Sequence, residues 1–385
     1  MDPYLFKRLW RRPWLSLCSL ILSGVLCFLM CFLTGYRQEQ EDKLRETQDS
    51  FEILCVVSNV RGNQTTSLRL WSWAEYFVTS DEFELHNYVK DLRMTKEYEV
   101  SSLELGVMDA LATGVTNQRC SERLDPALGG GTQYITDEFY TSEDRICIVS
   151  EEVYDQLGED KTVKLALRDP AINEYVEADL GFGAYEFQVV GCYNGKGPNL
   201  FIPFRTAQAI SVEISQRTTV DSIAFLAADN RKLDKLSEAA SLKFKTVDPL
   251  SPDLESISAA LTIHDEQYRA TVAVLEQNIE RTAYLIPVIL LLSLGVGFLI
   301  SFLATRGERM TYALMRTLGM TKGRLFASIL REQMFLTLLA ALTAALITGR
   351  FQPALWYLLC HSIGCCIAVI RSVRVAPTAI LREQE

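Results

Sequence analysis

The sequence predicts an α-helical membrane protein with four transmembrane helices and a large mixed α+β extracytoplasmic domain carried on helical stalks. Three observations favour this fold class: four long stretches without charged residues, an uneven division of charge, and alternating strand-like and helix-like segments after the first stretch. The average composition, with 49% hydrophobic and 22% charged residues, hides this pattern because the apolar residues are not spread evenly.

Four stretches contain no Asp, Glu, Lys or Arg: 13–36, 282–305, 333–349 and 351–370. A helix needs about 20 apolar residues to cross the hydrocarbon core of a bilayer. Three stretches reach this length, and the third reaches it if preceding polar residues continue the helix, with Arg331 extending its charge to the interface. The first stretch follows a basic segment, as in a signal peptide. Its apolar region is longer than the usual 7–15 or so residues and no small-residue cleavage site follows, which favours a retained anchor.

Charge is divided unevenly along the chain. Residues 37–281 carry 24 Lys/Arg and 43 Asp/Glu, a net charge of −19, whereas the rest of the chain has a net charge of +9. Only one basic residue of that remainder, Arg350, lies in the short turn between the third and fourth stretches. Because basic residues accumulate on the cytoplasmic side, we expect both termini and 306–332 in the cytoplasm of a multi-pass plasma-membrane protein.

This topology divides the chain into eight segments. They are a cytoplasmic N-terminus (1–12), transmembrane helix 1 (13–36), an extracytoplasmic stalk and α+β domain (37–281), transmembrane helix 2 (282–305), a cytoplasmic segment (306–332), transmembrane helix 3 (333–349), transmembrane helix 4 (351–370) and a cytoplasmic tail (371–385). The outer region has a size compatible with one domain or with two lobes, about 51–118 with 215–250 and about 119–214.

Strand-like and helix-like patterns alternate in the outer region. Residues 36–50 are polar and free of Gly and Pro, which predicts a stalk that extends the first membrane helix. Residues 253–281 predict a helical return stalk, because their apolar residues recur at roughly helical spacing. Between the stalks, FEILCVVSNV and YEFQVVGCY are strand-like, SWAEYFVTSDEFELHNYVKDL is predicted mostly helical, and LGGGTQYITDEF is predicted to be a loop.

No catalytic pattern is present. The glycines at 129–131 lack the Lys–Ser/Thr of a P-loop, and GMTKGR has the wrong spacing, so the chain contains no Walker motif with which to hydrolyse ATP. His86 and His264 have no nucleophile motif nearby and are expected on the surface or in packing. His361, in the fourth stretch, is either a functional ionisable group or, as we favour, a neutral group hydrogen-bonded to a neighbouring helix.

Ten cysteines divide between the membrane stretches and the outer region. The six in the membrane stretches are expected to be small packing residues. Cys55, Cys120, Cys147 and Cys192 match no zinc spacing, and they are as compatible with free thiols as with up to two disulfides. We expect no metal site. Asn63 begins an N-glycosylation sequon, which is informative only in a eukaryotic secretory setting.

The cytoplasmic segment concentrates six Lys/Arg and two Glu between two uncharged stretches. Leu314, Met315 and Leu318 would form the apolar side of a short helix, with Arg316 on another side. Gly319 would end this helix before a second one enters the membrane. Such a segment fits a cleft on a soluble partner, or it is a surface loop whose basic residues only hold the topology. The physical pattern favours neither.

This segment resembles the loop between the second and third membrane helices of the FtsX/MacB family of ABC-transporter permease subunits, also called type VII or mechanotransmission permeases. The family pattern is similar to R-x-E-x-A-L-L-R-x-L-G followed by a basic turn. The residues that fit it are Arg309, Ala313, Leu314, Met315, Arg316, Leu318 and Gly319. Thr311 stands where the family usually has Glu, and Glu332 resembles the family's acidic residue at the head of the third membrane helix.

Two further stretches are similar to the same family. ICIVSEEVYDQLGEDKTVKLAL resembles the MacB-like periplasmic core, although Asp160–Lys161 replaces the usual Gly–Asp. The terminal VAPTAILRE resembles the family's closing motif at Pro377, Leu381 and Arg382.

The resemblance implies a permease half that pairs with a second copy or a paralogue and with two cytoplasmic ABC ATPase subunits. ATP and Mg would bind to those ATPases, and this chain would hold no cofactor and would not itself be an enzyme. Closure of the ATPases would rock the segment from Ala313 to Gly319 and move the outer domain, for export or extraction of a peptide, lipoprotein or amphipathic compound.

Two alternatives remain open from the sequence. One is a non-exporting transducer that activates an extracytoplasmic enzyme, and the other is an ATP-independent membrane sensor or scaffold. A membrane-anchored extracytoplasmic enzyme lacks a catalytic constellation. Membrane lipid is an expected partner in every case, and nucleic acid is not.

Overall fold

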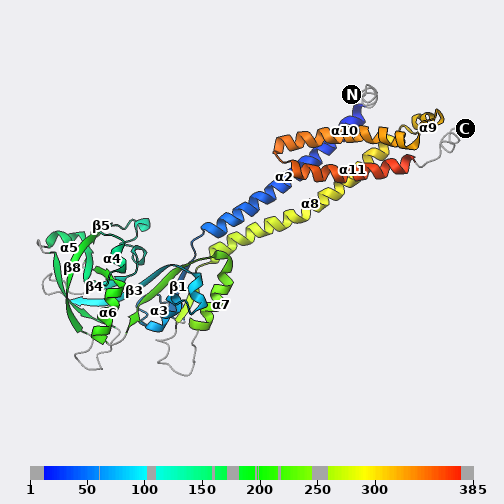
Figure 1. Ribbon diagram of the computed structural model, residues 1–385. Helices are drawn as coiled ribbons and strands as arrows, with labels where there is room; N and C mark the ends of the chain where they lie inside the picture. Colours follow the sequence, from blue (N-terminus) through cyan, green and yellow to red (C-terminus); the bar gives the residue numbers. More distant parts are fainter. Residues whose placement is uncertain are drawn as a thin grey trace. The chain divides into compact units, whose positions relative to one another are not determined.

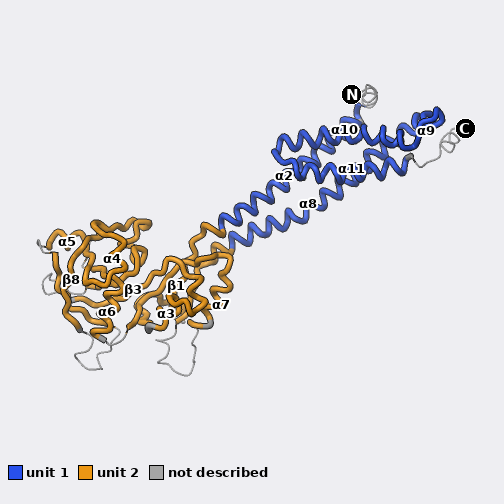
Figure 2. Tube along the Cα trace, in the orientation of Figure 1, with its two compact units in different colours: residues 1–47, 270–385 blue, residues 48–269 orange. Residues whose placement is uncertain are grey.

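The structure is a computed structural model, and it describes residues 13–59, 61–101, 110–157, 161–170, 182–195, 197, 199–215, 218–244 and 259–373. The chain divides into two compact units, a helical unit of residues 1–47 with 270–385 and an outer unit of residues 48–269 (Figure 2). The predicted N-terminal segment 1–12, Asp160, and the closing motif at Pro377, Leu381 and Arg382 lie outside the described residues.

Among the described residues, five helices belong to the membrane part of the chain, and Figure 1 labels them. They are α2 (Pro13–Ser50), α8 (Glu266–Arg306), α9 (Arg309–Thr317), α10 (Lys322–Thr348) and α11 (Phe351–Val373). All except α9 are long and apolar enough to cross a membrane, which confirms the four predicted membrane helices. At 38 and 41 residues, α2 and α8 greatly exceed the 20 or so residues that a span requires, and their polar ends continue as the predicted stalks.

Small residues allow close helix contacts in the helical unit. Cys27 and Cys31 of α2 pack with three buried alanines of α10 and with Tyr357 of α11. A Cβ added to Gly297 of α8 would lie 2.5 Å from the His361 carbonyl oxygen of α11, so these two helix backbones are in direct contact. In lipid, the hydrophobic effect does not drive helices together, so the van der Waals contacts of closely packed helices stabilise their association instead.

The outer unit is a mixed α+β domain, as predicted. Its strands are β1 (Leu54–Asn59), β2 (Leu70–Trp71), β3 (Val89–Ser101), β4 (Ala110–Val115), β5 (Thr132–Gln133), β6 (Ile146–Ser150), β7 (Thr162–Arg168), β8 (Phe182–Tyr193), β9 (Leu200–Pro203), β10 (Thr219–Val220), β11 (Ser222–Ala227) and β12 (Ala259–Ile263). Its helices are α3 (Ser72–Thr79), α4 (Glu138–Thr141), α5 (Glu151–Gln156), α6 (Phe204–Ser215) and α7 (Leu233–Phe244), with short 3₁₀ turns η1 (Glu84–Tyr88), η2 (Gln118–Cys120), η3 (Pro126–Leu128) and η4 (Asn230–Lys232).

Strand β3 joins two groups of strands (Figure 1). Its first half pairs with β11, and β1 and β12 continue the sheet from there. Its second half pairs with β4 on one edge and β7 on the other. Among the described strands, pairing continues from β4 through β9, β6 and β8 to β7, which closes a six-stranded ring. The ring encloses a core of apolar side chains that α6 completes with Ala207, Ile210 and Ile214.

A buried charge cluster lies where the edge of β3 passes from β11 to β7. Lys96 is fully buried, and its Nζ lies 3.1 Å from Asp169 Oδ1 and 3.6 Å from Asp221 Oδ2. The same ammonium donates to Thr219 Oγ1 at 2.6 Å. Asp169 directly follows β7 and Asp221 directly precedes β11, so one cation ties together both strands that share this edge. Burial raises the pKa of the Asp221 carboxyl, although Lys96 opposes that rise.

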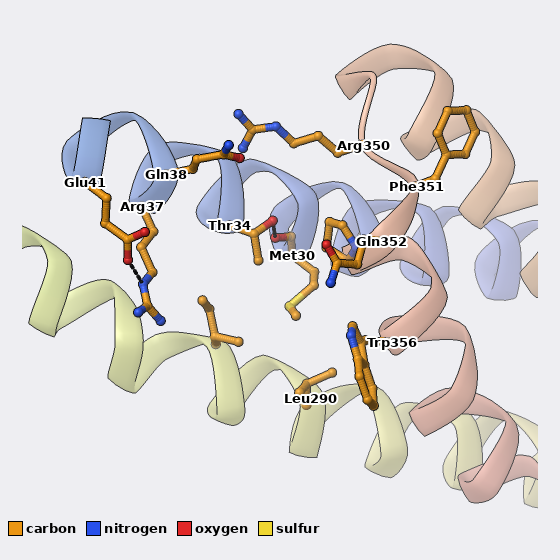
Figure 3. Close-up of a pocket in the computed structure, with 12 residues that line it drawn as sticks. Met30, Thr34, Arg37, Gln38, Glu41, Leu290, Arg350, Phe351, Gln352 and Trp356 are labelled. Atoms are coloured by element: carbon orange, nitrogen blue, oxygen red, sulfur yellow. Dashed lines mark hydrogen bonds and ion pairs between the residues drawn. The ribbon is translucent and has the colours of Figure 1, made fainter. Parts of the chain in front are cut away.

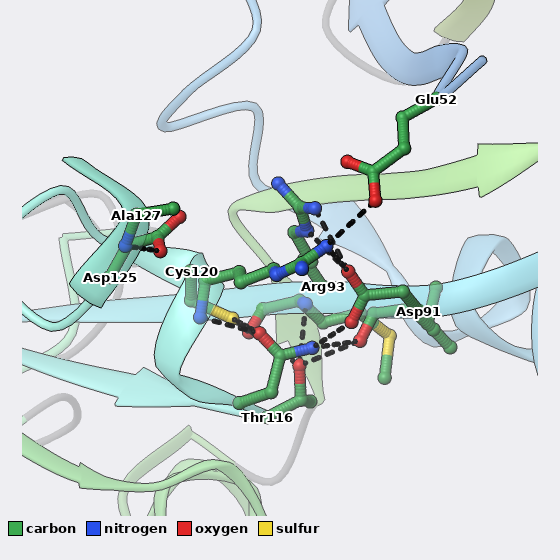
Figure 4. Close-up of polar contacts among 11 residues, drawn as sticks. Glu52, Asp91, Arg93, Thr116, Cys120, Asp125 and Ala127 are labelled. Atoms are coloured by element: carbon green, nitrogen blue, oxygen red, sulfur yellow. Dashed lines mark hydrogen bonds and ion pairs between the residues drawn. The ribbon is translucent and has the colours of Figure 1, made fainter. Parts of the chain in front are cut away.

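A polar network holds the first part of β3 to the loop after β4 (Figure 4). Asp91 has a positive φ of 51°, and its carboxylate accepts from Arg93 at 2.9 Å, Arg119 at 3.2 Å and Asn117 at 3.1 Å. Thr116 Oγ1 accepts from the backbone N–H of Met94 at 2.9 Å. These bonds compensate for the irregular backbone in β3, where the pairing register with β11 also shifts.

Two secondary-structure predictions are partly wrong. The return stalk was expected to be helical from residue 253, but residues 259–263 form strand β12 and α8 begins at Glu266. This strand pairs along its whole length with β1, at least 200 residues earlier, a contact that local spacing cannot reveal. The segment 72–92, predicted mostly helical, contains α3 and η1 but ends in β3, because its last residues pair with β11.

The four outer cysteines are free thiols. Cys55, Cys147 and Cys192 are buried and Cys120 is half-buried. Burial raises the pKa of the Cys55 thiol and of the Cys147 thiol to about 12. Of the two alternatives left open by the sequence, the structure therefore has the free thiols.

Candidate functional site

The candidate site is the short helix α9 with the turn that joins it to α10. The turn is a Schellman motif: Gly319 N–H donates to the Arg316 carbonyl at 3.2 Å and Met320 N–H donates to the Met315 carbonyl at 3.1 Å. Gly319 has φ +93°, which explains the glycine at this position. Thr321 then caps α10, its side chain accepting from the backbone N–H of Arg324. The sequence thus produces the predicted order of helix, break and second helix.

One side of α9 is packed inside the helical unit. Ala313 is buried, and Tyr312 and Met315 are half-buried against a cluster formed by α10 and α11. That cluster consists of Leu325, Ile329 and Val369. Its contacts fix the orientation of α9 about its own axis.

The opposite side of α9 carries an exposed apolar row. Met310, Leu314 and Leu318 are spaced by four residues, so they lie along one side of the helix. Their exposed fractions are 40%, 52% and 86%. Met320, in the turn, extends the exposed apolar surface. We call Met310, Leu314 and Leu318 the α9 apolar row.

The structure separates residues that the sequence pattern had grouped. Leu314 and Leu318 belong to the exposed row, but Met315 lies on the packed side with Ala313. Arg316 is half-buried and lies on a different side from Leu314, as predicted. Met310 was missed, although its spacing of four residues before Leu314 could have indicated it.

Basic residues flank the apolar row in the sequence. Arg306, Lys322 and Arg324 are exposed, whereas Arg309 is half-buried. A segment with an exposed apolar row and neighbouring cations is suited to a groove with an apolar floor and an acidic rim.

The remaining predicted positions lie apart from the row. Thr311 is exposed on α9, where the family pattern usually has Glu. Glu332 is half-buried within α10, about three turns after its start. Within this continuous helix it directly precedes the uncharged stretch 333–349.

No group of three or more His, Cys, Asp or Glu side chains is placed to hold a metal ion among the described residues. His361 is buried in α11, with its Nδ1 3.5 Å from Tyr357 Oη on the same helix. His86 Nε2 lies 3.1 Å from Asp81 Oδ1 in the outer unit, a contact that is largely exposed.

Comparisons with known proteins give only distant structural similarity. No family model matches the chain, and no curated protein matches it. The periplasmic region of MacB from Actinobacillus actinomycetemcomitans is similar at 13% identity and a TM-score of 0.32, over 61% of this chain and 95% of that chain. The extracellular domain of the ABC-type transporter YknZ from Gram-positive bacteria is similar at 12% identity and a TM-score of 0.32, over 55% of this chain and 98% of that chain. Similarity at this level carries no argument about function, which must rest on the chain's own residues.

Proposed function

We propose that this chain is the permease subunit of an ABC transporter and that α9 couples it to a separate cytoplasmic ATPase. The main supporting observation is the α9 apolar row, which is exposed on a short helix between two membrane helices and is flanked in the sequence by Lys and Arg. Basic residues mark the cytoplasmic side, and exposed leucines at helical spacing suit a groove on a soluble partner. Both termini would lie on that same side of the plasma membrane.

In this proposal, force passes from the ATPase through α9 into the membrane helices. The packed side of α9, at Tyr312 and Met315, contacts α10 and α11, and the short Schellman turn of residues 318–321 joins α9 to α10. A partner that grips the apolar row would therefore move α10 directly. ATP and Mg would bind to two ATPase subunits, and a second permease copy or paralogue would complete the transporter. The substrate would be a peptide, lipoprotein or amphipathic compound for export or extraction.

The test is co-purification of an ATPase from native membranes with tagged full-length protein. Wild type is compared with Leu314→Glu/Leu318→Glu, and bound ATPase is identified by mass spectrometry and by its activity. A buried interface anchor contributes about 2 kcal/mol or more, so each Glu should weaken binding by at least about 30-fold.

The matched control is Leu128→Glu/Val212→Glu, which places the same charges at exposed apolar positions of the outer unit. This variant should retain the ATPase. If wild type brings down no ATPase, or if both variants retain it equally, the coupling proposal is wrong and an ATP-independent sensor or scaffold takes its place.

A further inference from the structure

A cavity of about 790 Å³ lies within the helical unit, between α2, α8 and the start of α11 (Figure 3). This volume is within the range of about 300–1,000 Å³ that ligand pockets occupy. Met30 of α2, Leu290 of α8 and Trp356 of α11 line its apolar part. Arg37 and Arg350 line its polar part, together with amide and hydroxyl side chains. The cavity is therefore amphipathic along its length.

Three independent features of the sequence place the cavity at a membrane boundary. The uncharged stretch of α2 ends immediately before Arg37, that of α8 begins four residues before Ile286, and that of α11 begins at Phe351. All three residues line the cavity. Its apolar part is thus at the depth of acyl chains and its polar part at the depth of headgroups. Trp356 is of the residue type enriched at this boundary.

The Arg350 guanidinium has a donor without a hydrogen-bond partner at the polar part. Its Nη1 atom is buried and has no hydrogen-bond partner among the described residues. The guanidinium lies against α2 in the space that a Cβ on Gly35 would occupy. The Arg350 carbonyl also accepts a weak hydrogen bond from the Cys31 thiol at 3.7 Å, which holds the turn against α2. Because Nη1 is enclosed against α2, a ligand in the cavity would contact the guanidinium through its other donors.

The carboxylates around this cavity already have partners. Glu41 accepts from Arg37 Nε at 2.8 Å, as Figure 3 shows. Glu39, one residue away from the cavity lining, accepts from Lys43 at 2.7 Å. In the described part of the chain, Glu39 interacts electrostatically with Arg350, but no carboxylate forms a direct ion pair with it, so a direct contact remains open to an anion from outside the protein.

We propose that the cavity binds one phospholipid, with its phosphate on the Arg350 guanidinium and an acyl chain along Met30, Leu290 and Trp356. Arginine presents a planar pair of donors that matches phosphate oxygens. The bilayer supplies an amphiphile of this chemistry at the depth of the cavity. This site lies at the opposite ends of α10 and α11 from α9 and does not depend on ATPase coupling.

The test uses delipidated full-length protein in a mild detergent. It is titrated with phosphatidylglycerol, with diacylglycerol and with inorganic phosphate, and bound molecules are counted by native mass spectrometry. In a variant that keeps Trp356 as its single tryptophan, quenching by phosphatidylglycerol with brominated acyl chains reports the position of the chain. We expect one tightly bound phosphatidylglycerol per protein, little diacylglycerol, and weak binding of inorganic phosphate.

Two variants test whether Arg350 binds the phospholipid, as distinct from any effect on folding. Arg350→Gln should weaken phosphatidylglycerol binding by at least about tenfold, because it removes a charge-assisted hydrogen bond. Gly35→Ala should weaken it as well, since the new methyl displaces the guanidinium, although alanine favours the α2 helix. Arg371→Gln, at the exposed other end of α11, is the matched control and should leave binding unchanged.

Three results would overturn the proposal. Equal binding of phosphatidylglycerol by wild type and Arg350→Gln would exclude the phosphate contact. Equal binding of diacylglycerol, or of inorganic phosphate, would show that the site recognises only one half of a phospholipid. A change in the monomer–dimer equilibrium of Arg350→Gln without a change in lipid binding would mean that a second copy of the chain covers the cavity.

Discussion

Replacing Lys96 by Met should strongly destabilise the outer unit. Lys96 is fully buried between Asp169 and Asp221, which are themselves 1% and 2% exposed. Removing one partner of a buried ion pair typically lowers the free energy of unfolding by about 3–5 kcal/mol, because an uncompensated charge remains. For a unit of this size, 1 kcal/mol corresponds to about 2–4 °C, so Lys96→Met should lower Tm by about 6–20 °C.

The loss should depend on pH in a defined direction. Burial already raises the pKa of the Asp221 carboxyl, and removal of Lys96 removes an interaction that lowers it. Below the unfolded-state pKa of about 3.9, the carboxyl is protonated in both the folded and the unfolded state. It is then neutral, and its burial carries no charge penalty. Stability is lost as pH rises from there through the raised folded-state pKa. The deficit of Lys96→Met relative to wild type should therefore be largest at neutral pH and should shrink toward pH 4.

Differential scanning calorimetry of the full-length protein in detergent measures this effect. Lys232→Met is the matched control, because its ion pair with Asp229 at 3.1 Å is exposed and should contribute under about 1 kcal/mol. The variant Lys96→Met/Asp169→Asn/Asp221→Asn removes all three charges and should recover most of the loss. A Lys96→Met Tm within error of the Lys232→Met Tm would refute the reasoning, as would a deficit that grows on acidification.

Three further predictions concern the glycines and thiols. Gly319→Ala should destabilise the α9–α10 turn by about 1–2 kcal/mol, because φ +93° is unfavourable for alanine although no atom lies within 4 Å of the new Cβ. Limited proteolysis at this turn should therefore be faster than in wild type, and an unchanged cleavage rate would contradict the assignment of this turn. Gly297→Val should separate α8 from α11, because its Cβ would meet the His361 carbonyl; a lower Tm in detergent is expected, with the unobstructed Gly295→Val as control. Cys55 and Cys147, each with a pKa raised to about 12, should be only about one part in ten thousand thiolate at pH 8. Neither thiol should react with iodoacetamide until the protein is denatured. If the denatured protein reacts only after a reductant is added, the thiols are not free.

The candidate site could be predicted in position but not in detail. Gly319 and the basic surroundings indicated a short helix and its end, because glycine and charge act through local backbone and solvation effects. The orientation of α9 about its own axis could not be predicted from these residues alone. Met315 packs inward because Leu325, Ile329 and Val369 meet it there, and that contact requires α10 and α11 to be in place.

The amino-acid sequence by itself determined the four membrane helices and the mixed character of the outer unit. A bilayer requires internal backbone hydrogen bonds and about 20 apolar residues per helix, and both requirements act on contiguous sequence. Long-range pairing is different, because a strand is specified by partners that are distant in the chain. Only the tertiary structure made residues 259–263 a strand beside β1, gathered Lys96, Asp169 and Asp221 into one cluster, and placed Arg350 over Gly35.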